Sequence, residues 1–285
     1  MRRSAPATAA PVTAGPPARL GRGAERALLG ILGAVVFVGA WHLLTTTLEL
    51  GAFRRLPGPL DVLGEWLAVE PIYGVSLFTA DYWAHIAAST WRAWLAFALA
   101  VGLGVPLGLA MGWRRAVRDY AGGLIGLLRP IPPLAWVPLA ILLLPTNAAA
   151  VVFVTFLVAF FATVINTVTG VDAIDRDYFR AARCLGASEW RVLTDVVLPG
   201  ALPAIFTGLQ VAMGAAWFSL AAGEMIAAQH GLGFLIWEAY NLIQYPTIVI
   251  GMITLGLLGY ASSAVIRGIG ARLTRWRGRA IGQEA

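Results

Sequence analysis

Three charged side chains lie inside or at the edge of long apolar runs, and they are the first candidates for chemistry in this sequence. They are Arg92, Arg129 and Glu224. Charged groups are costly in hydrocarbon and usually face the interior of a helix bundle or a polar pathway. Two arginines beside a pathway would suit an anionic solute. Alternatively, Arg92 extends to the membrane surface, and Glu224 is a structural partner for a nearby donor.

The sequence offers little for enzymatic catalysis. All 21 basic residues are arginine, so the chain has no lysine for a phosphate loop or a Schiff base. The single cysteine, Cys184, excludes an internal disulfide and a thiolate metal cluster. His42, His85 and His230 do not cluster in the sequence, and we expect each at the membrane interface. We therefore predict no catalytic residue, no metal site and no cofactor bound by this chain.

The composition indicates that a lipid bilayer surrounds these residues. The chain has 285 residues, of which 59% are hydrophobic and 13% are charged, against about 25% charged residues in soluble domains. Several apolar runs approach the roughly 20 residues that a helix needs to cross a bilayer. Six such runs lie at about 27–44, 86–112, 121–144, 148–170, 201–226 and 247–269. The prediction is an all-α integral membrane protein with six transmembrane helices.

Arginines are unevenly distributed over the predicted loops. Seventeen lie in the N-terminal tail, the 113–119 loop, the 171–199 loop and the C-terminus, with Arg267 at the end of the sixth run counted in the last, whereas the opposite set of loops holds only Arg54 and Arg55. Because cytoplasmic loops are enriched in arginine and lysine, both termini and the 171–199 loop are predicted to be cytoplasmic. The net charge of +6 then reflects topology and contact with anionic membrane lipid, and requires no nucleic acid.

The domain organisation follows from this topology. Residues 1–25 are rich in Ala, Pro and Gly, and we expect a disordered cytoplasmic tail there. A cleaved signal peptide is the alternative, but the first apolar run is too long and no cleavage site follows it. Residues 26–275 are predicted to form the membrane domain, and residues 276–285 a second cytoplasmic tail.

The third apolar run contains an unusual density of proline. It contains the sequence RPIPP at 129–133, and Trp136, Pro138 and Pro145 follow. Proline removes backbone donors and kinks helices, and free backbone in lipid is tolerated only where it is buried or lines a cavity. We therefore predict a broken helix that lines a pathway, with a kinked packing helix as the alternative. The complete set of pathway candidates is Arg92, Arg129, Pro132, Pro133, Trp136 and Glu224.

A row of glycines in the second apolar run predicts close helix packing rather than a site. These glycines are Gly102, Gly104, Gly108 and Gly112.

The charged stretch at 176–199 has the pattern of a helix–glycine–helix hairpin. Tyr178, Ala181, Ala182 and Leu185 share one helical face. Gly186 is a natural helix end, and Ser188 is a candidate cap for a second short helix. A charged hairpin between two membrane helices predicts a docking surface.

The same stretch resembles the cytoplasmic loop signature of ABC importer permeases, in which EAA is followed after three residues by Gly and, nine residues later, by I-x-L-P. The matching residues are Arg180, Ala181, Ala182, Gly186, Val196, Leu198 and Pro199. The strings RPIPPLAWVPLAILLL, INTVTGVDAID, LPGALPAIFTGLQVAMGAAW and AAGEMIAAQHGLGFLIWEA are similar to the nitrate/sulfonate/taurine/bicarbonate class of these permeases. The resemblance covers roughly residues 55–270.

This resemblance implies a type I ABC importer permease fold in the bacterial inner membrane. Two copies would form a pathway for a small solute, most simply an anion such as nitrate, a sulfonate, taurine or bicarbonate. Two separate ATPase subunits would bind ATP and Mg and hydrolyse ATP, and an extracytoplasmic binding protein would deliver the solute. The implied ATPase-coupling residues are Asp177, Tyr178, Arg180, Ala181, Ala182, Leu185, Gly186, Leu198 and Pro199.

The sequence departs from the family pattern at two places. Arg180 stands where the signature has an acidic residue, so an ion pair made by that Glu in relatives would be absent or inverted. The stretch LPTNAAAVV after the third run replaces a Gly-rich acidic turn. The alternative function is a self-sufficient secondary transporter or channel, which would need its own coupling charges near the membrane midplane.

Overall fold

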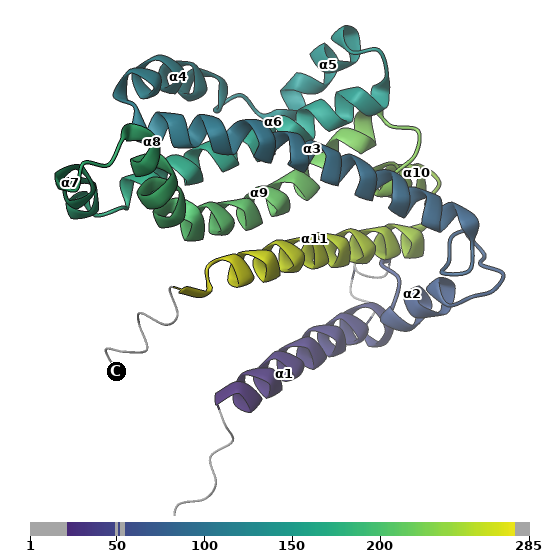
Figure 1. The fold of residues 1–285 in the computed structure, drawn as a ribbon. Helices are drawn as coiled ribbons and strands as arrows, with labels where there is room; N and C mark the ends of the chain where they lie inside the picture. Colours follow the sequence, from purple (N-terminus) through teal and green to yellow (C-terminus); the bar gives the residue numbers. More distant parts are fainter. Residues whose placement is uncertain (1–21, 49–50, 52–54, 277–285) are drawn as a thin grey trace, which may run out of the picture. The chain divides into compact units, whose positions relative to one another are not determined.

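The computed structural model describes residues 22–48, 51 and 55–276 (Figure 1). The predicted tail segments 1–21 and 277–285 lie outside these described residues. The chain forms two compact units, residues 1–59 and 60–285, which are described separately. The described residues form helices and no strand, in agreement with the predicted all-α class.

The first unit consists mainly of one membrane-length helix. Helix α1 (Arg22–His42) continues into a single π-helical turn, η1 (Leu43–Thr47). The Thr45 hydroxyl donates to the Trp41 carbonyl at 2.9 Å, and the Trp41 indole donates to the Pro57 carbonyl at 3.1 Å. The helix begins at Arg22, so residues 22–25 are helical and the predicted disordered tail is too long at its C-terminal end.

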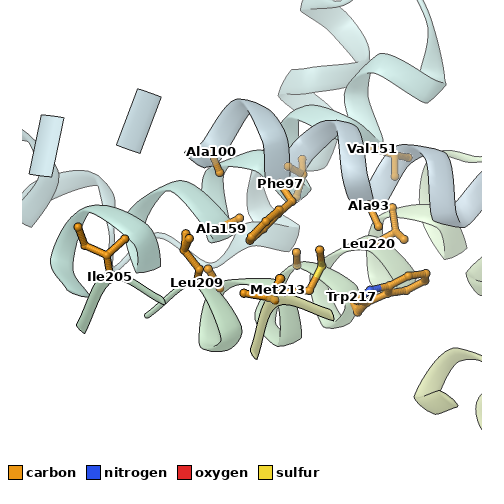
Figure 2. Close-up of a cluster of buried hydrophobic side chains, with 14 of the residues drawn as sticks. Ala93, Phe97, Ala100, Val151, Ala159, Ile205, Leu209, Met213, Trp217 and Leu220 are labelled. Carbon is orange, nitrogen blue, oxygen red and sulfur yellow. The ribbon is translucent and has the colours of Figure 1, made fainter. Parts of the chain in front are cut away.

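The second unit is built around three long helices that pack together (Figure 1). They are α3 (Ala80–Trp113), α6 (Asn147–Asp172) and α9 (Leu198–Ala227). Figure 2 shows their apolar side chains pointing toward one another, with Phe97 from α3 and Met213 from α9 in the cluster. A fourth long helix, α11 (Tyr245–Leu273), packs on α9 and on the shorter α10 (Leu232–Asn241). Helix α2 (Pro59–Trp66) lies at the boundary with the first unit.

Close contact between α3 and α6 depends on glycine. Close packing was predicted for four glycines of α3, and it is confirmed for three of them. A Cβ at Gly108 would lie 2.6 Å from the Thr167 Cβ, and Gly104 and Gly112 meet α6 in the same way. Gly102 differs, because no atom lies within 4 Å of its position. The two backbones therefore approach each other along one glycine face of α3.

We expect Gly108→Ala to destabilise the protein, because its new methyl group would force α3 and α6 apart. Overpacking of this kind costs about 1–3 kcal/mol. Gly102→Ala is the matched control, since its methyl group meets nothing within the chain. The measurement is the thermal unfolding midpoint of the purified protein in detergent. Equal midpoints for the two variants would contradict the packing role of Gly108.

The proline-rich run forms a broken helix. Helix α4 (Arg115–Leu128) is followed by a 3-10 turn, η3 (Pro133–Trp136), and by α5 (Val137–Leu143), with a bend of 88° between the two halves. With five unbroken spans this bent pair gives up to six, as predicted. The predicted 113–119 loop is wrong, because only Arg114 separates α3 from α4.

The 176–199 stretch forms the predicted pair of short helices, α7 (Arg176–Cys184) and α8 (Glu189–Val192). The Ser188 hydroxyl caps α8, and Gly186 between the helices has a φ of +74°. The predicted loop boundary at residue 199 is too late, since α8 continues through a π-helical turn, η4 (Leu193–Val197), into α9. One helical segment therefore runs from Glu189 to Ala227.

Candidate functional site

Helix α7 lies at the end of the bundle where α3, α6 and α11 finish (Figure 1). Its Asp175 cap accepts a hydrogen bond from the Asp177 amide at 3.0 Å. Tyr178, Ala181 and Leu185 are exposed, and Leu185 retains 88% of its accessible surface. Tyr178 and Trp190 of the same hairpin also leave large side chains exposed, and several such side chains together are typical of a surface that a partner covers.

The two alanines of the signature lie in different environments. Ala182 is half-buried and packs, with Phe179, against the apolar core of the unit, whereas Ala181 is exposed. The sequence alone placed both on the face that meets a partner. The structure leaves Ala181, Leu185 and Gly186 as the accessible part of that face.

The atypical Arg180 makes its ion pair within α7. Its guanidinium lies 3.0 Å from the Asp177 carboxylate, one helical turn earlier, and both side chains are more than three-quarters exposed. Such exposed pairs contribute little to stability. The pair does, however, place a positive and a negative group side by side on the surface of α7.

The junction between α8 and α9 links the α7 end to the bundle. Val192 and Val197 are buried, and the Thr194 hydroxyl donates to the Trp190 carbonyl at 3.1 Å inside the π-helical turn. Leu198 and Pro199 therefore belong to the first turn of α9 and not to a loop. Because the helix is continuous, a displacement of α8 would be transmitted directly to α9.

A pocket of about 290 Å³ collects the residues of the broken helix. Arg129, Pro133 and Trp136 line it together with Asn166 from α6 and Val211 from α9. Pro132 precedes the 3-10 turn and is exposed. Arg129 is also exposed, and no salt bridge joins it to a carboxylate among the described residues. The pocket therefore contains an available guanidinium group and an amide. Asn166 was missed in the sequence, because a single Asn in an apolar run gives no signal.

Arg92 and Glu224 form an ion pair instead of lining a common pathway. The Arg92 Nη1 lies 2.7 Å from the Glu224 Oε1, with the arginine side chain 12% exposed and the glutamate fully buried. The same nitrogen also donates to the His230 carbonyl. Of the two roles considered for Glu224, the geometry supports that of a structural partner. Arg92 is therefore held by these two contacts.

The Glu224 carboxylate also holds the beginning of α10. It accepts hydrogen bonds from the Ser89 hydroxyl at 2.8 Å and from the Gly233 amide at 3.0 Å, while the Leu232 amide donates to Ser89 at 2.8 Å. A negative group at a helix N-terminus is favourable because the amides there are unpaired. We call Ser89, Arg92, Glu224, Gly231 and Gly233 the α10 clasp.

Two glycines make the clasp possible. Gly231 has a φ of +136°, and a Cβ there would overlap the Glu224 carboxylate. A Cβ at Gly233 would overlap the Ala221 carbonyl. The Gly-x-Gly at 231–233 gives no functional signal as a sequence motif, yet it permits this contact. Its spacing after an intramembrane Glu is the clue that sequence reasoning missed.

One histidine packs against the α10 clasp. His85 is buried, and its Nδ1 lies 3.0 Å from both the amide nitrogen and the carbonyl oxygen of Gly231. Its ring centroid is 5.8 Å from that of His230. In the described part of the chain, no three His, Cys, Asp or Glu side chains are grouped as metal ligands.

The two arginines proposed for a pathway lie in different cavities. Arg92 borders an apolar groove of about 650 Å³ between α3 and α6, whereas Arg129 lines the pocket at the broken helix. Only Arg129, Pro133 and Trp136 are brought together in one cavity.

A multi-span helical membrane protein with an exposed helix hairpin at one end of its bundle has the architecture of a transporter permease. The family described as "Binding-protein-dependent transport system inner membrane component" matches residues 104–279. The chain belongs to this family, whose members are multi-pass permeases of the bacterial inner membrane.

Individual relatives agree with this assignment. The chain is 36% identical over 232 residues to the taurine transport system permease protein TauC of Escherichia coli, covering 81% of this chain and 84% of TauC. It is 33% identical to the nitrate import permease protein NrtB of Leptolyngbya laminosa, covering 90% and 91%. A solved structure of the inward-facing MetNI methionine ABC transporter shares the fold, with a TM-score of 0.57 at 18% identity, covering 67% of this chain and 93% of that one.

Proposed function

We propose that this permease carries a small anion across the membrane in an ATP-driven importer. Two copies of the chain form the pathway, two ATPase subunits dock at α7, and an extracytoplasmic binding protein delivers the solute. The observation that carries the proposal is the exposed face of α7 next to a helix that runs unbroken from α8 into the bundle. This arrangement gives a partner ATPase a direct connection to α9.

In this proposal the α7 end of the bundle is cytoplasmic. Most of the arginines lie in segments that this orientation places in the cytoplasm, as the positive-inside rule requires. Both termini then lie on the cytoplasmic side, with terminal tails flanking the membrane domain at residues 26–275. The α10 clasp, at the opposite end from α7 in Figure 1, faces the outside.

The coupling surface consists of the accessible residues around α7. Ala181 and Gly186 have short side chains, so a groove on the ATPase could receive the helix closely. Asp177, Tyr178, Arg180 and Leu185 surround them, and Ala182 supports the helix from behind. Leu198 and Pro199, in the first turn of α9, carry the movement into the bundle.

The pocket at the broken helix is the proposed solute contact. The Arg129 guanidinium is a suitable donor for an oxyanion. The Asn166 amide nitrogen donates one hydrogen to the Ala162 carbonyl at 2.8 Å and has a second hydrogen to donate. The names of TauC and NrtB refer to taurine and nitrate, and both are small solutes with an anionic group. A nitrate, sulfonate or carboxylate-sized anion is therefore the proposed substrate class.

The test is reconstitution of the purified permease in lipid vesicles, with and without its ATPase and binding protein. We expect ATP-dependent uptake of an anion only from the complete assembly, and we expect the ATPase to co-purify with the permease. Uptake by this chain alone would overturn the proposal in favour of a self-sufficient transporter.

We expect Arg129→Gln to reduce anion uptake by about tenfold, since one charge-assisted hydrogen bond contributes about 1.5 kcal/mol or more. Arg129→Lys is the matched control, because it keeps the positive charge, and its loss of uptake should be smaller. Initial rates over a range of solute concentrations would separate an effect on KM from one on kcat. Unchanged rates in Arg129→Gln would remove this residue from the pathway.

A further inference from the structure

A polar crevice of about 400 Å³ lies at the α7 end of the bundle, behind the proposed docking face. It is bordered by the end of α3, the start of α4, the end of α6, and by α7 and α8. Its charged lining consists of Arg114, Arg115, Arg176, Arg183, Asp172 and Glu189.

The arginines of this crevice outnumber its carboxylates, and the carboxylates are already engaged. Asp172 lies 2.6 Å from the Arg118 guanidinium, and Glu189 lies 3.7 Å from that of Arg114. Within the described ranges, no salt bridge joins Arg115, Arg176 or Arg183 to a carboxylate. Three guanidinium groups therefore border one cavity with no counter-charge from these residues, which favours an anionic occupant.

The remaining lining of the crevice is apolar, and the crevice lies where the membrane-length helices α3 and α6 end. Val171 and Phe179 contribute to its walls, and the Arg114 guanidinium lies 4.6 Å from the centre of the Trp113 ring. Trp113 is the last residue of the membrane-length helix α3, and tryptophan is enriched where membrane helices meet water. An occupant with both an anionic head and apolar chains fits such a lining.

We propose that this crevice binds the phosphodiester headgroup of an anionic phospholipid. Arginine is well suited to this ligand, because its planar guanidinium donates two parallel hydrogen bonds to phosphate oxygens. An acidic segment of an ATPase is the competing occupant. The lipid is favoured because the crevice opens where α3 and α6 end, while the exposed face of α7 carries Ala181 and Leu185 instead.

The proposal gives α7 two distinct faces. Arg176, Phe179 and Arg183 follow one another at helical spacing and line the crevice, whereas the exposed Ala181 and Leu185 do not line it. A bound phosphate would thus bridge α7 to Arg115 at the start of α4. Anionic lipid would hold the docking helix against the membrane domain.

The test is lipid binding by the purified full-length chain, measured by native mass spectrometry in detergent with dioleoyl phosphatidylglycerol or dioleoyl phosphatidylcholine. We expect Arg176→Gln with Arg183→Gln to weaken phosphatidylglycerol binding about 100-fold, since each charge-assisted hydrogen bond from arginine to phosphate contributes about tenfold. Phosphatidylcholine should bind weakly to every variant. Because no ATPase or solute is present, this result does not depend on the proposed transport function.

The matched control is Arg267→Gln with Arg272→Gln. Both arginines are exposed and lie toward the C-terminal end of α11, which is at the same end of the bundle as α7 (Figure 1). This double variant removes the same charge, and we expect its phosphatidylglycerol binding to be close to that of the unmodified chain. An equal loss in both double variants would overturn the site and indicate general surface attraction. Unchanged phosphatidylglycerol binding in Arg176→Gln/Arg183→Gln would also overturn the site. In a separate purification with the ATPase, loss of the ATPase from this variant alone would then assign the two arginines to an acidic protein partner.

Discussion

Glu224→Ala is expected to destabilise the permease more than any other single substitution in the bundle. It would leave the Arg92 guanidinium, only 12% exposed, without its carboxylate. It would also remove the acceptor for Ser89 and for the Gly233 amide. Breaking a buried ion pair from one side costs about 3–5 kcal/mol. For a protein of this size, that corresponds to a fall in unfolding midpoint of about 6–20 °C.

The measurement is the loss of the monodisperse size-exclusion peak of the detergent-purified protein after heating. Two variants isolate the cause. Glu224→Gln keeps the shape and some hydrogen bonds, so it should lose less stability than Glu224→Ala. Replacing both partners, Arg92→Met with Glu224→Met, removes the unpaired charge and should also be less harmful than Glu224→Ala alone. A double variant that is less stable than Glu224→Ala would show that the clasp does not act as a charge pair.

The fold could largely be predicted from the sequence, because membrane helices are specified by the length of apolar runs and by the proline and glycine residues that interrupt or end them. The span containing RPIPP breaks where proline removes backbone donors, and Gly186 has the positive φ expected of a helix end. The sequence does not show where a helix continues through a residue that normally marks its end. Pro199 suggests a boundary, yet α8 and α9 form one segment, with the π-helical turn η4 just before this proline.

The position of the α7 site in the sequence could be predicted, but which of its residues are exposed and which are covered could not. Ala181 and Ala182 are adjacent and chemically identical, and only the packing of Phe179 and its neighbours against the core decides which is covered. The α10 clasp could not be predicted from the sequence, for a different reason. Ser89 and Glu224 lie on different helices. Their contact depends on glycines, because a side chain at those positions would overlap the neighbouring atoms.

Gly186→Arg is expected to abolish ATP-driven uptake while leaving a folded, membrane-inserted protein. Gly186 is exposed with a φ of +74°, and no atom of the chain lies within 4 Å of where a Cβ would stand. The substitution therefore costs the strain of a left-handed residue, about 1–2 kcal/mol, without an internal clash. A bulky side chain at the centre of a docking surface commonly costs 2 kcal/mol or more, about 30-fold in affinity for the ATPase.

Gly186→Asn separates the two effects, because asparagine tolerates the left-handed conformation with a smaller side chain. We expect it to retain ATPase binding and most uptake, while Gly186→Arg loses both. The readouts are the amount of ATPase that co-purifies with each variant and the rate of ATP-dependent uptake in vesicles. Normal uptake in Gly186→Arg would contradict docking at α7. Equal loss in both variants would instead assign the effect to the backbone turn, because the helix would then fail to form before any partner could bind it.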